Sequence, residues 1–281
     1  MYWVAAYFSE SIMSSLEFTK DAARQLEALY LTNDVIAQRS ETLKQLQLIK
    51  GDHIIDIGCG PGFLCESMAE VVDETGHVVG IDTSADLVGL ADRRNTRDWL
   101  SYRVGDALAI EEPDASFDVA VCTQVAEYIP DVAKVISEAY RVLKPGGRAL
   151  FVATDWDGVI WHSDSPARMA TVMKSWETHC AHPRLPRSLS ERLGRGGFKL
   201  QRVSVFPILN LDWGNDTYSK HLSRLIHSFV ESRDDVAVDE LADWIAEHPH
   251  LSDQGRYFFC SNRFIFYASK PESAKSSRLE N

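Results

Sequence analysis

The chain has 281 residues, of which 45% are hydrophobic and 25% are charged. This composition is that of a folded globular protein, with enough chain for one large domain or a domain and a cap. The formal net charge of -12 disfavours broad binding to nucleic-acid phosphates. No apolar run approaches the roughly 18 to 20 residues that span a bilayer, and the start lacks the basic region of a signal peptide. We therefore expect a cytoplasmic protein.

The cysteines and histidines indicate neither a disulfide framework nor a metal site. The five cysteines are an odd number and form no CxxC pair. His179 and His182 end a predicted helix without a second pair of ligands. We expect no bound metal.

The first half of the chain predicts helices followed by alternating strands and helices. Residues 16–47 have apolar side chains at helical spacing, and Thr32 or Asn33 is a suitable N-cap for the second helix. We then predict strands over 53–57, 78–81, 102–104, 117–122 and 148–154, with helices up to about 72, over 84–94 and over 132–143. This alternation predicts a parallel sheet covered by helices on both faces.

The second half has longer helical segments between its strands. Ser165 followed by Pro166 is a typical helix start, and Gly196 with Gly197 is a typical helix end. We predict the last two strands over 200–208 and 257–268. Helical segments over about 156–186 and 210–255 interrupt this part and predict cap insertions at one edge of the sheet.

A glycine-rich turn follows the first predicted strand. Residues 54–62 read Ile-Ile-Asp-Ile-Gly-Cys-Gly-Pro-Gly. A dinucleotide site requires G-x-G-x-x-G, whereas here the third glycine comes one residue early. Asp56 would repel a pyrophosphate and would suit the ammonium group of a ligand that contains an amino acid. The turn therefore favours such a ligand over a dinucleotide.

This turn resembles the first motif of class I S-adenosylmethionine-dependent methyltransferases. Residues 29–39 also resemble the entry helices of the ubiquinone/menaquinone-biosynthesis branch. The resemblance implies an α/β fold with a Rossmann-like, seven-stranded, doubly wound, mostly parallel sheet whose last strand is antiparallel. It implies N-terminal helices over 1–50, a methyltransferase domain over 51–281, and S-adenosyl-L-methionine as cofactor. Its specific motifs cover residues 29–155, and beyond 156 it is topological.

The resemblance also implies the residues that hold the cofactor. Asp82 ends the second strand and would accept hydrogen bonds from ribose hydroxyls, although an acid there could simply cap the next helix. Asp106 would contact the adenine amino group, and Arg39 the cofactor carboxylate. The expected cofactor residues are Tyr30, Arg39, Asp56, Gly58, Cys59, Gly60, Gly62, Asp82, Thr83, Asp106, Ala107 and Thr123.

The acceptor site is expected beside the cofactor, at the carboxyl ends of the strands. The family often has a Glu-His pair after the fourth strand, but here Tyr128 replaces the histidine. Residues 154–162 contain two tryptophans, two aspartates and a histidine, which suit an aromatic or cationic small molecule. We expect an acceptor pocket that contains Tyr128, Trp156, Trp161 and Met173, with His162 as candidate general base. The alternative is that both tryptophans pack the cap and His162 either caps a backbone end or faces solvent.

The function implied is S-adenosylmethionine-dependent methyl transfer to a small-molecule acceptor by in-line displacement. This reaction needs alignment and desolvation more than covalent catalysis, so no catalytic triad is required. We expect a monomer or homodimer with no nucleic-acid partner and no membrane span. Two alternatives stay open: an RNA or protein methyltransferase, and a non-catalytic homologue that binds the cofactor.

Overall fold

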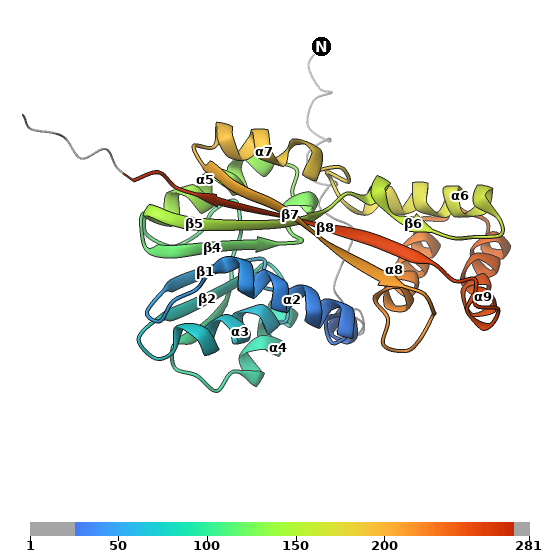
Figure 1. Ribbon diagram of the computed structural model, residues 1–281, viewed down its shortest axis with the longest axis horizontal. Helices are drawn as coiled ribbons and strands as arrows, with labels where there is room; N and C mark the ends of the chain where they lie inside the picture. The colour runs from blue at the N-terminus through green and yellow to red at the C-terminus, as the bar shows by residue number, and fades with distance from the viewer. Residues whose placement is uncertain (1–25, 273–281) are drawn as a thin grey trace, which may run out of the picture.

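A computed structural model of the chain describes residues 26–272 (Figure 1). Its centre is one eight-stranded sheet in the order β3-β2-β1-β4-β5-β8-β6, with β7 paired to the other edge of β8. Neighbouring strands from β3 to β5 pair in parallel, and β8 is antiparallel to β5, β6 and β7. The strands are β1 His53–Ile57, β2 His77–Asp82, β3 Leu100–Val104, β4 Phe117–Thr123, β5 Leu143–Thr154, β6 Ile160–Trp161, β7 Lys199–Asn210 and β8 Phe259–Ser269.

Helices cover both faces of this sheet. On one face, α2 and α3 pack on the inner strands, and on the other face α5 and α7 do so (Figure 1). The inner strands are apolar runs rather than alternating patterns because side chains on both faces are buried. The helices are α2 Asn33–Leu46, α3 Phe63–Val72, α4 Ala85–Arg94, α5 Val132–Val142, α6 Pro166–Trp176, α7 Pro186–Arg195, α8 Tyr218–Arg233 and α9 Val238–Asp253.

A second lobe surrounds the far ends of β7 and β8. Helices α6, α8 and α9 lie there with β6, beyond the end of the parallel strands (Figure 1). Tryptophans from four segments meet histidines and phenylalanines in its buried core. These three helices fall within the ranges 156–186 and 210–255 that the sequence predicts as cap insertions. We call this lobe the cap.

The predicted strand count of seven is wrong, because β6 is an eighth strand. β5 pairs with β8 from Arg263 to Ser269, which leaves the beginning of β8 free on that edge. β6 occupies this free edge through two residues, Ile160 and Trp161. Two residues are too few to show the period-two pattern by which a strand is recognised in a sequence.

Local signals explain most helix boundaries. Thr32 caps α2 by accepting a hydrogen bond from the Val35 amide, and Ser84 caps α4 in the same way. Pro166 begins α6 as predicted, although Ser165 makes no side-chain cap bond. Residues 1–25 lie outside the described residues. They include the beginning of the predicted helical stretch 16–47 and half of the predicted N-terminal unit 1–50. No helix between residues 26 and 272 combines the length and apolar character that a membrane span needs.

Candidate active site

The glycine turn between β1 and α3 is fixed by its backbone conformation and by β2. Gly58, Gly60 and Gly62 all have positive φ angles, of 76°, 51° and 83°. The amides of Gly58 and Cys59 donate to the Ile81 carbonyl at 2.8 and 2.9 Å. A Cβ at Gly58 would lie 2.2 Å from a Val125 methyl carbon. Only glycine therefore fits position 58, both in conformation and in space.

Asp82 links this turn to the start of α4. One carboxylate oxygen accepts from the Gly60 amide and the other from the Ser84 amide, each at 2.9 Å. Burial raises the pKa of Asp82 in spite of these two bonds. Each oxygen keeps a second lone pair, so the carboxylate can also accept hydrogen bonds from a ligand.

Asp56 lies at the base of the site with an unsatisfied oxygen. Its side chain is 1% exposed, and its Oδ2 accepts from the Cys65 thiol at 3.2 Å. Its Oδ1 has no hydrogen-bond partner among residues 26–272, and neither has the hydroxyl of Thr123 at the end of β4. Burial raises the pKa of Asp56 to about 7. A cationic donor placed here would satisfy Oδ1 and favour the ionised form.

A pocket opens between this turn, α2 and the end of β4. Arg39 of α2 donates to the Tyr30 carbonyl at 3.4 Å, and its guanidinium lies 5.2 Å from the centre of the Phe63 ring. The Tyr30 hydroxyl is buried, which raises its pKa. The lining residues are Tyr30, Val35, Gln38, Arg39, Thr42, Asp56, Gly58, Cys59, Pro61, Phe63, Leu64 and Thr123.

Six of the expected cofactor residues line this pocket: Tyr30, Arg39, Asp56, Gly58, Cys59 and Thr123. Gly60, Gly62 and Asp82 belong to the same turn and its support. Thr83 is exposed just after β2. Asp106 lies in an exposed turn after β3, where its carboxylate accepts from the Leu108 amide at 2.8 Å, and Ala107 beside it is buried. Gln38, Thr42 and Phe63 also line the pocket and were not expected from the sequence.

The residues at this site fit S-adenosylmethionine. The orphaned oxygen of Asp56 suits an ammonium group, and Arg39 suits a carboxylate. Positive φ angles at the turn let the backbone approach a nucleoside closely. Among the described residues, no group of three or more His, Cys, Asp or Glu side chains could hold a metal ion.

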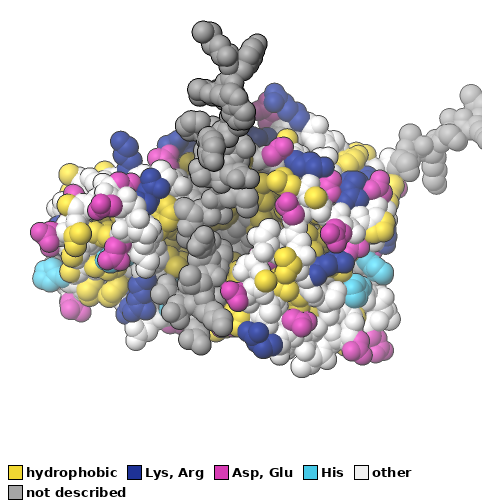
Figure 2. Space-filling model, turned by 180° about the vertical axis from the view of Figure 1, so that it is seen from behind, with side chains coloured by type: hydrophobic (Ala, Val, Ile, Leu, Met, Phe, Trp, Pro, Cys, Tyr) yellow, Lys and Arg dark blue, Asp and Glu magenta, His cyan; other side chains and the backbone are white. Residues whose placement is uncertain are grey.

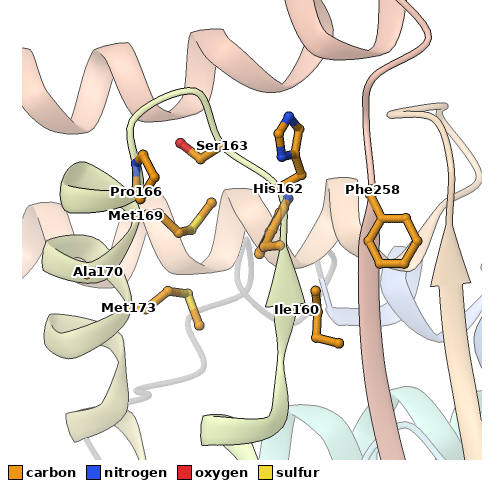
Figure 3. A pocket seen from close by; sticks show the side chains of 9 residues that line it. Ile160, His162, Ser163, Pro166, Met169, Ala170, Met173 and Phe258 are labelled. Carbon is orange, nitrogen blue, oxygen red and sulfur yellow. The ribbon is translucent and has the colours of Figure 1, made fainter.

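The residues expected around the acceptor do not gather in one place. Tyr128 is half-buried near the carboxyl end of β4, with its ring 5.7 Å from that of His179. Trp156 and Trp161 are both buried in the cap core, as the packing alternative has it. Met173, Trp161 and His162 instead line a second, more open pocket between α6, β6 and Phe258 (Figure 3).

That second pocket gives little support to His162 as a general base. None of its lining residues lines the pocket at the glycine turn. The His162 side chain is 42% exposed, and Asp164 lies 4.0 Å from its Nε2. Met169 and Met173 of α6 point toward β6, so the pocket wall is largely apolar (Figure 3).

A buried polar cluster lies beside the first pocket instead. The Arg263 side chain of β8 bonds Gln38 and Thr154, and Thr154 donates to Gln124 at 2.7 Å. Glu127 is fully buried next to Thr154, and burial raises its pKa to about 7. Sequence reasoning missed this cluster because its members come from distant segments. An arginine within the aromatic strand 257–268 was the one available signal.

The sheet order and the glycine turn resemble those of class I S-adenosylmethionine-dependent methyltransferase domains. Residues 55–151 match the family model described as "Methyltransferase domain". S-adenosylmethionine is therefore the cofactor to which this domain is fitted.

Two curated relatives match part of the chain. A demethylmenaquinone methyltransferase of Lactobacillus johnsonii is 32% identical over 120 residues, which are 41% of this chain and 49% of that protein. A ubiquinone biosynthesis O-methyltransferase of Paraburkholderia phymatum is 38% identical over 107 residues, which are 37% of this chain and 44% of that protein. The chain thus spans less than half the length of each relative.

Solved structures share the fold at low sequence identity. Phosphoethanolamine N-methyltransferase 2 of Haemonchus contortus, solved with S-adenosyl-L-methionine, has a TM-score of 0.62 and 20% identity, covering 93% of this chain and 59% of that one. The cyclase SpnF has a TM-score of 0.54 and 21% identity, and the match covers 85% of this chain and 82% of that one. Since a cyclase shares this fold, the fold alone does not establish methyl transfer.

Proposed function

We propose that the protein transfers a methyl group from S-adenosylmethionine to a small-molecule acceptor. The observation behind this proposal is the pocket at the glycine turn, where one buried oxygen of Asp56 has no partner among the described residues. When bound, the cofactor supplies a methyl on a sulfonium, so that the acceptor's lone pair forms the new bond as the carbon–sulfur bond breaks and sulfur becomes neutral.

The residues of the chain would act by binding and orientation. In this proposal Asp56 receives the cofactor ammonium, Arg39 its carboxylate and Asp82 its ribose, while Asp106 faces the adenine. Tyr30 and Phe63 would exclude water from the methionine end, because their rings lie 6.4 Å apart at the pocket wall. Exclusion of water and a fixed line of approach are the main sources of rate in such a displacement.

The surface charges of the protein and the names of its relatives favour a small-molecule acceptor over a macromolecule. On the face shown in Figure 2, Lys and Arg are interspersed with Asp and Glu, and the described residues form no continuous basic patch there. The relatives named above are, by their names, a demethylmenaquinone methyltransferase and an O-methyltransferase of ubiquinone biosynthesis. We propose the cytoplasm as the compartment and a monomer or homodimer as the assembly, which fractionation and sedimentation would test.

Calorimetry with S-adenosylmethionine and S-adenosylhomocysteine tests the cofactor. We expect wild type and Asp86→Asn, an exposed control, to bind both ligands. Asp56→Asn should bind more weakly because it removes the negative charge that faces the ammonium group. No binding by wild type at millimolar ligand would refute the proposal.

Release of S-adenosylhomocysteine across a panel of small molecules, bulk RNA and proteins then tests the acceptor. Turnover with RNA or protein alone would contradict the small-molecule class. The likeness to a cyclase favours one second candidate, a cofactor-binding protein that transfers no methyl group. Tight cofactor binding without turnover on any member of the panel would support that candidate.

A further inference from the structure

Arg263 is a buried cation at the carboxyl edge of the sheet. It is 3% exposed. In the antiparallel ladder it lies opposite Thr154, the last residue of β5. The carboxyl ends of parallel strands are the edge at which ligands bind in open α/β sheets. Arg263 therefore lies at the ligand edge although it belongs to β8.

The described residues leave the charge of Arg263 without a partner of opposite sign. Its Nε donates to the Gln38 Oε1 at 3.1 Å, and its Nη1 donates to the Thr154 hydroxyl. The Tyr218 ring centre lies 4.8 Å from its Cζ. All three partners are neutral, and no Asp or Glu between residues 26 and 272 forms an ion pair with Arg263. A buried charge is costly unless an opposite charge compensates it.

Glu127 compensates this charge only in part. The charge of Arg263 lowers the pKa of Glu127, but burial has the larger effect and raises that pKa to about 7. Glu127 therefore carries less than a full negative charge at neutral pH. Its Oε1 accepts from the Thr154 amide at 3.4 Å, and its Oε2 has no partner among the described residues.

The cluster adjoins the pocket at the glycine turn. Gln38 bonds Arg263 and also lines that pocket. The positive charge of Arg263 lowers the pKa of Tyr30, which lines the same pocket, whereas the negative charge of Asp82 raises that pKa. The amide nitrogen of Gln124, two bonds further along the cluster, has no partner among the described residues. The hydrogen-bonded cluster thus joins the cofactor pocket to Arg263 and leaves one donor, on Gln124, unsatisfied among the described residues.

We propose that Arg263 binds a carboxylate of the acceptor molecule, and so selects small monocarboxylic acids. This inference rests on the proposed function. Two of the five N–H groups of the guanidinium are used by Gln38 and Thr154, and the others remain for the two oxygens of a planar carboxylate. One cation fits a monoanion better than a phosphate dianion. A carboxylate held in this way is a poor nucleophile, so a different atom of the acceptor receives the methyl group.

The test uses benzoate, phenylacetate and octanoate against their primary amides, with phenyl phosphate as the dianionic probe. Binding to the full chain saturated with S-adenosylhomocysteine is measured by calorimetry and thermal shift. We expect at least one carboxylate to bind and its amide not to bind. Arg263→Gln should weaken that carboxylate by at least about tenfold. Arg263→Lys keeps the charge but loses the planar fork, so its affinity for that carboxylate should lie between those of wild type and Arg263→Gln.

Arg202→Gln is the matched control. Arg202 lies on β7, is exposed, and places its guanidinium 5.3 Å from the Tyr267 ring. The Arg202→Gln variant should bind the carboxylate as tightly as wild type does. Retained S-adenosylhomocysteine affinity in each Arg263 variant shows that the fold is intact.

Three results would overturn the inference while the cofactor still binds: no carboxylate binds wild type, amides bind as well as carboxylates, or Arg263→Gln binds like wild type. Tighter binding of phenyl phosphate than of benzoate would contradict the monocarboxylate class. Failure of wild type to bind S-adenosylhomocysteine would instead refute the proposed function itself.

Discussion

Replacement of Asp82 by alanine separates a role in cofactor binding from a role in capping. The carboxylate joins the glycine turn to α4 through two backbone amides, each at 2.9 Å. If its remaining lone pairs bind the ribose, Asp82→Ala should weaken S-adenosylhomocysteine binding by about 1 to 3 kcal/mol, the range for hydrogen bonds to a charged group. This corresponds to roughly a 5- to 150-fold rise in Kd.

The stability of the ligand-free protein should respond much less. Burial raises the pKa of Asp82, which means that desolvation of the carboxylate outweighs the two amide bonds. Removal of the carboxylate therefore removes an unfavourable contribution together with a favourable one. We expect the free energy of unfolding to fall by about 1 kcal/mol, the low end of the range for removing one partner of a buried hydrogen bond.

Calorimetry gives the affinity, and urea denaturation without ligand gives the stability. Asp86→Ala is the control, because Asp86 is an exposed acid in the first turn of the same helix. Unchanged affinity in Asp82→Ala would refute the ribose contact and leave Asp82 as a cap. A large loss of stability together with affinity would show that the turn needs Asp82 in order to fold.

Three further expectations follow from the described geometry. Gly58→Ala should lower the free energy of unfolding, and the positive φ alone accounts for about 1 to 3 kcal/mol of this loss. The double variant with Val125→Ala should relieve the clash between the new Cβ and the Val125 side chain but keep the cost of the positive φ. Urea denaturation of both variants measures the two contributions. Burial lowers the pKa of His248 to about 4. The unfolded chain therefore binds the extra proton as pH falls from 6.5 to 4, and wild type should lose about 1 kcal/mol more than His248→Phe between pH 7.5 and 5.5; equal losses would contradict this. His162→Ala should keep kcat/KM within about twofold once an acceptor is known, whereas a loss of a hundredfold or more would identify His162 as the base.

The parallel part of the sheet could be predicted because its signals are local. Each inner strand is a short apolar run that ends in a turn residue, and Ser84 and Thr32 cap the helices they precede. β5 was harder, because it begins at Leu143 and continues through Gly146 and Gly147, which read as a turn. The pairing with β4 shifts register between Leu143 and Arg148, and Gly146 and Gly147 exchange backbone hydrogen bonds with Lys270 instead, which keeps them in the strand in spite of their low strand propensity.

The polar cluster at the site could not be predicted in this way. Arg263 and Gln38 are 225 positions apart, and the packing of α2 against β8 brings them together. The aromatic segment 156–162 attracted the acceptor prediction by composition, yet Trp156 and Trp161 are buried in the cap. Composition predicts that a side chain is apolar, but it does not predict which of two cores the side chain joins.

The length of β7 and β8 has a consequence for protein engineering. Both strands pair along their whole length, from Lys199 opposite Ser269 to Asn210 opposite Phe259. One continuous ladder therefore supports the sheet at one end and the cap at the other. A chimera that exchanges the cap for that of a relative must exchange the distal halves of both strands with it, since loop grafting alone would leave α8 and α9 without the strands on which they pack.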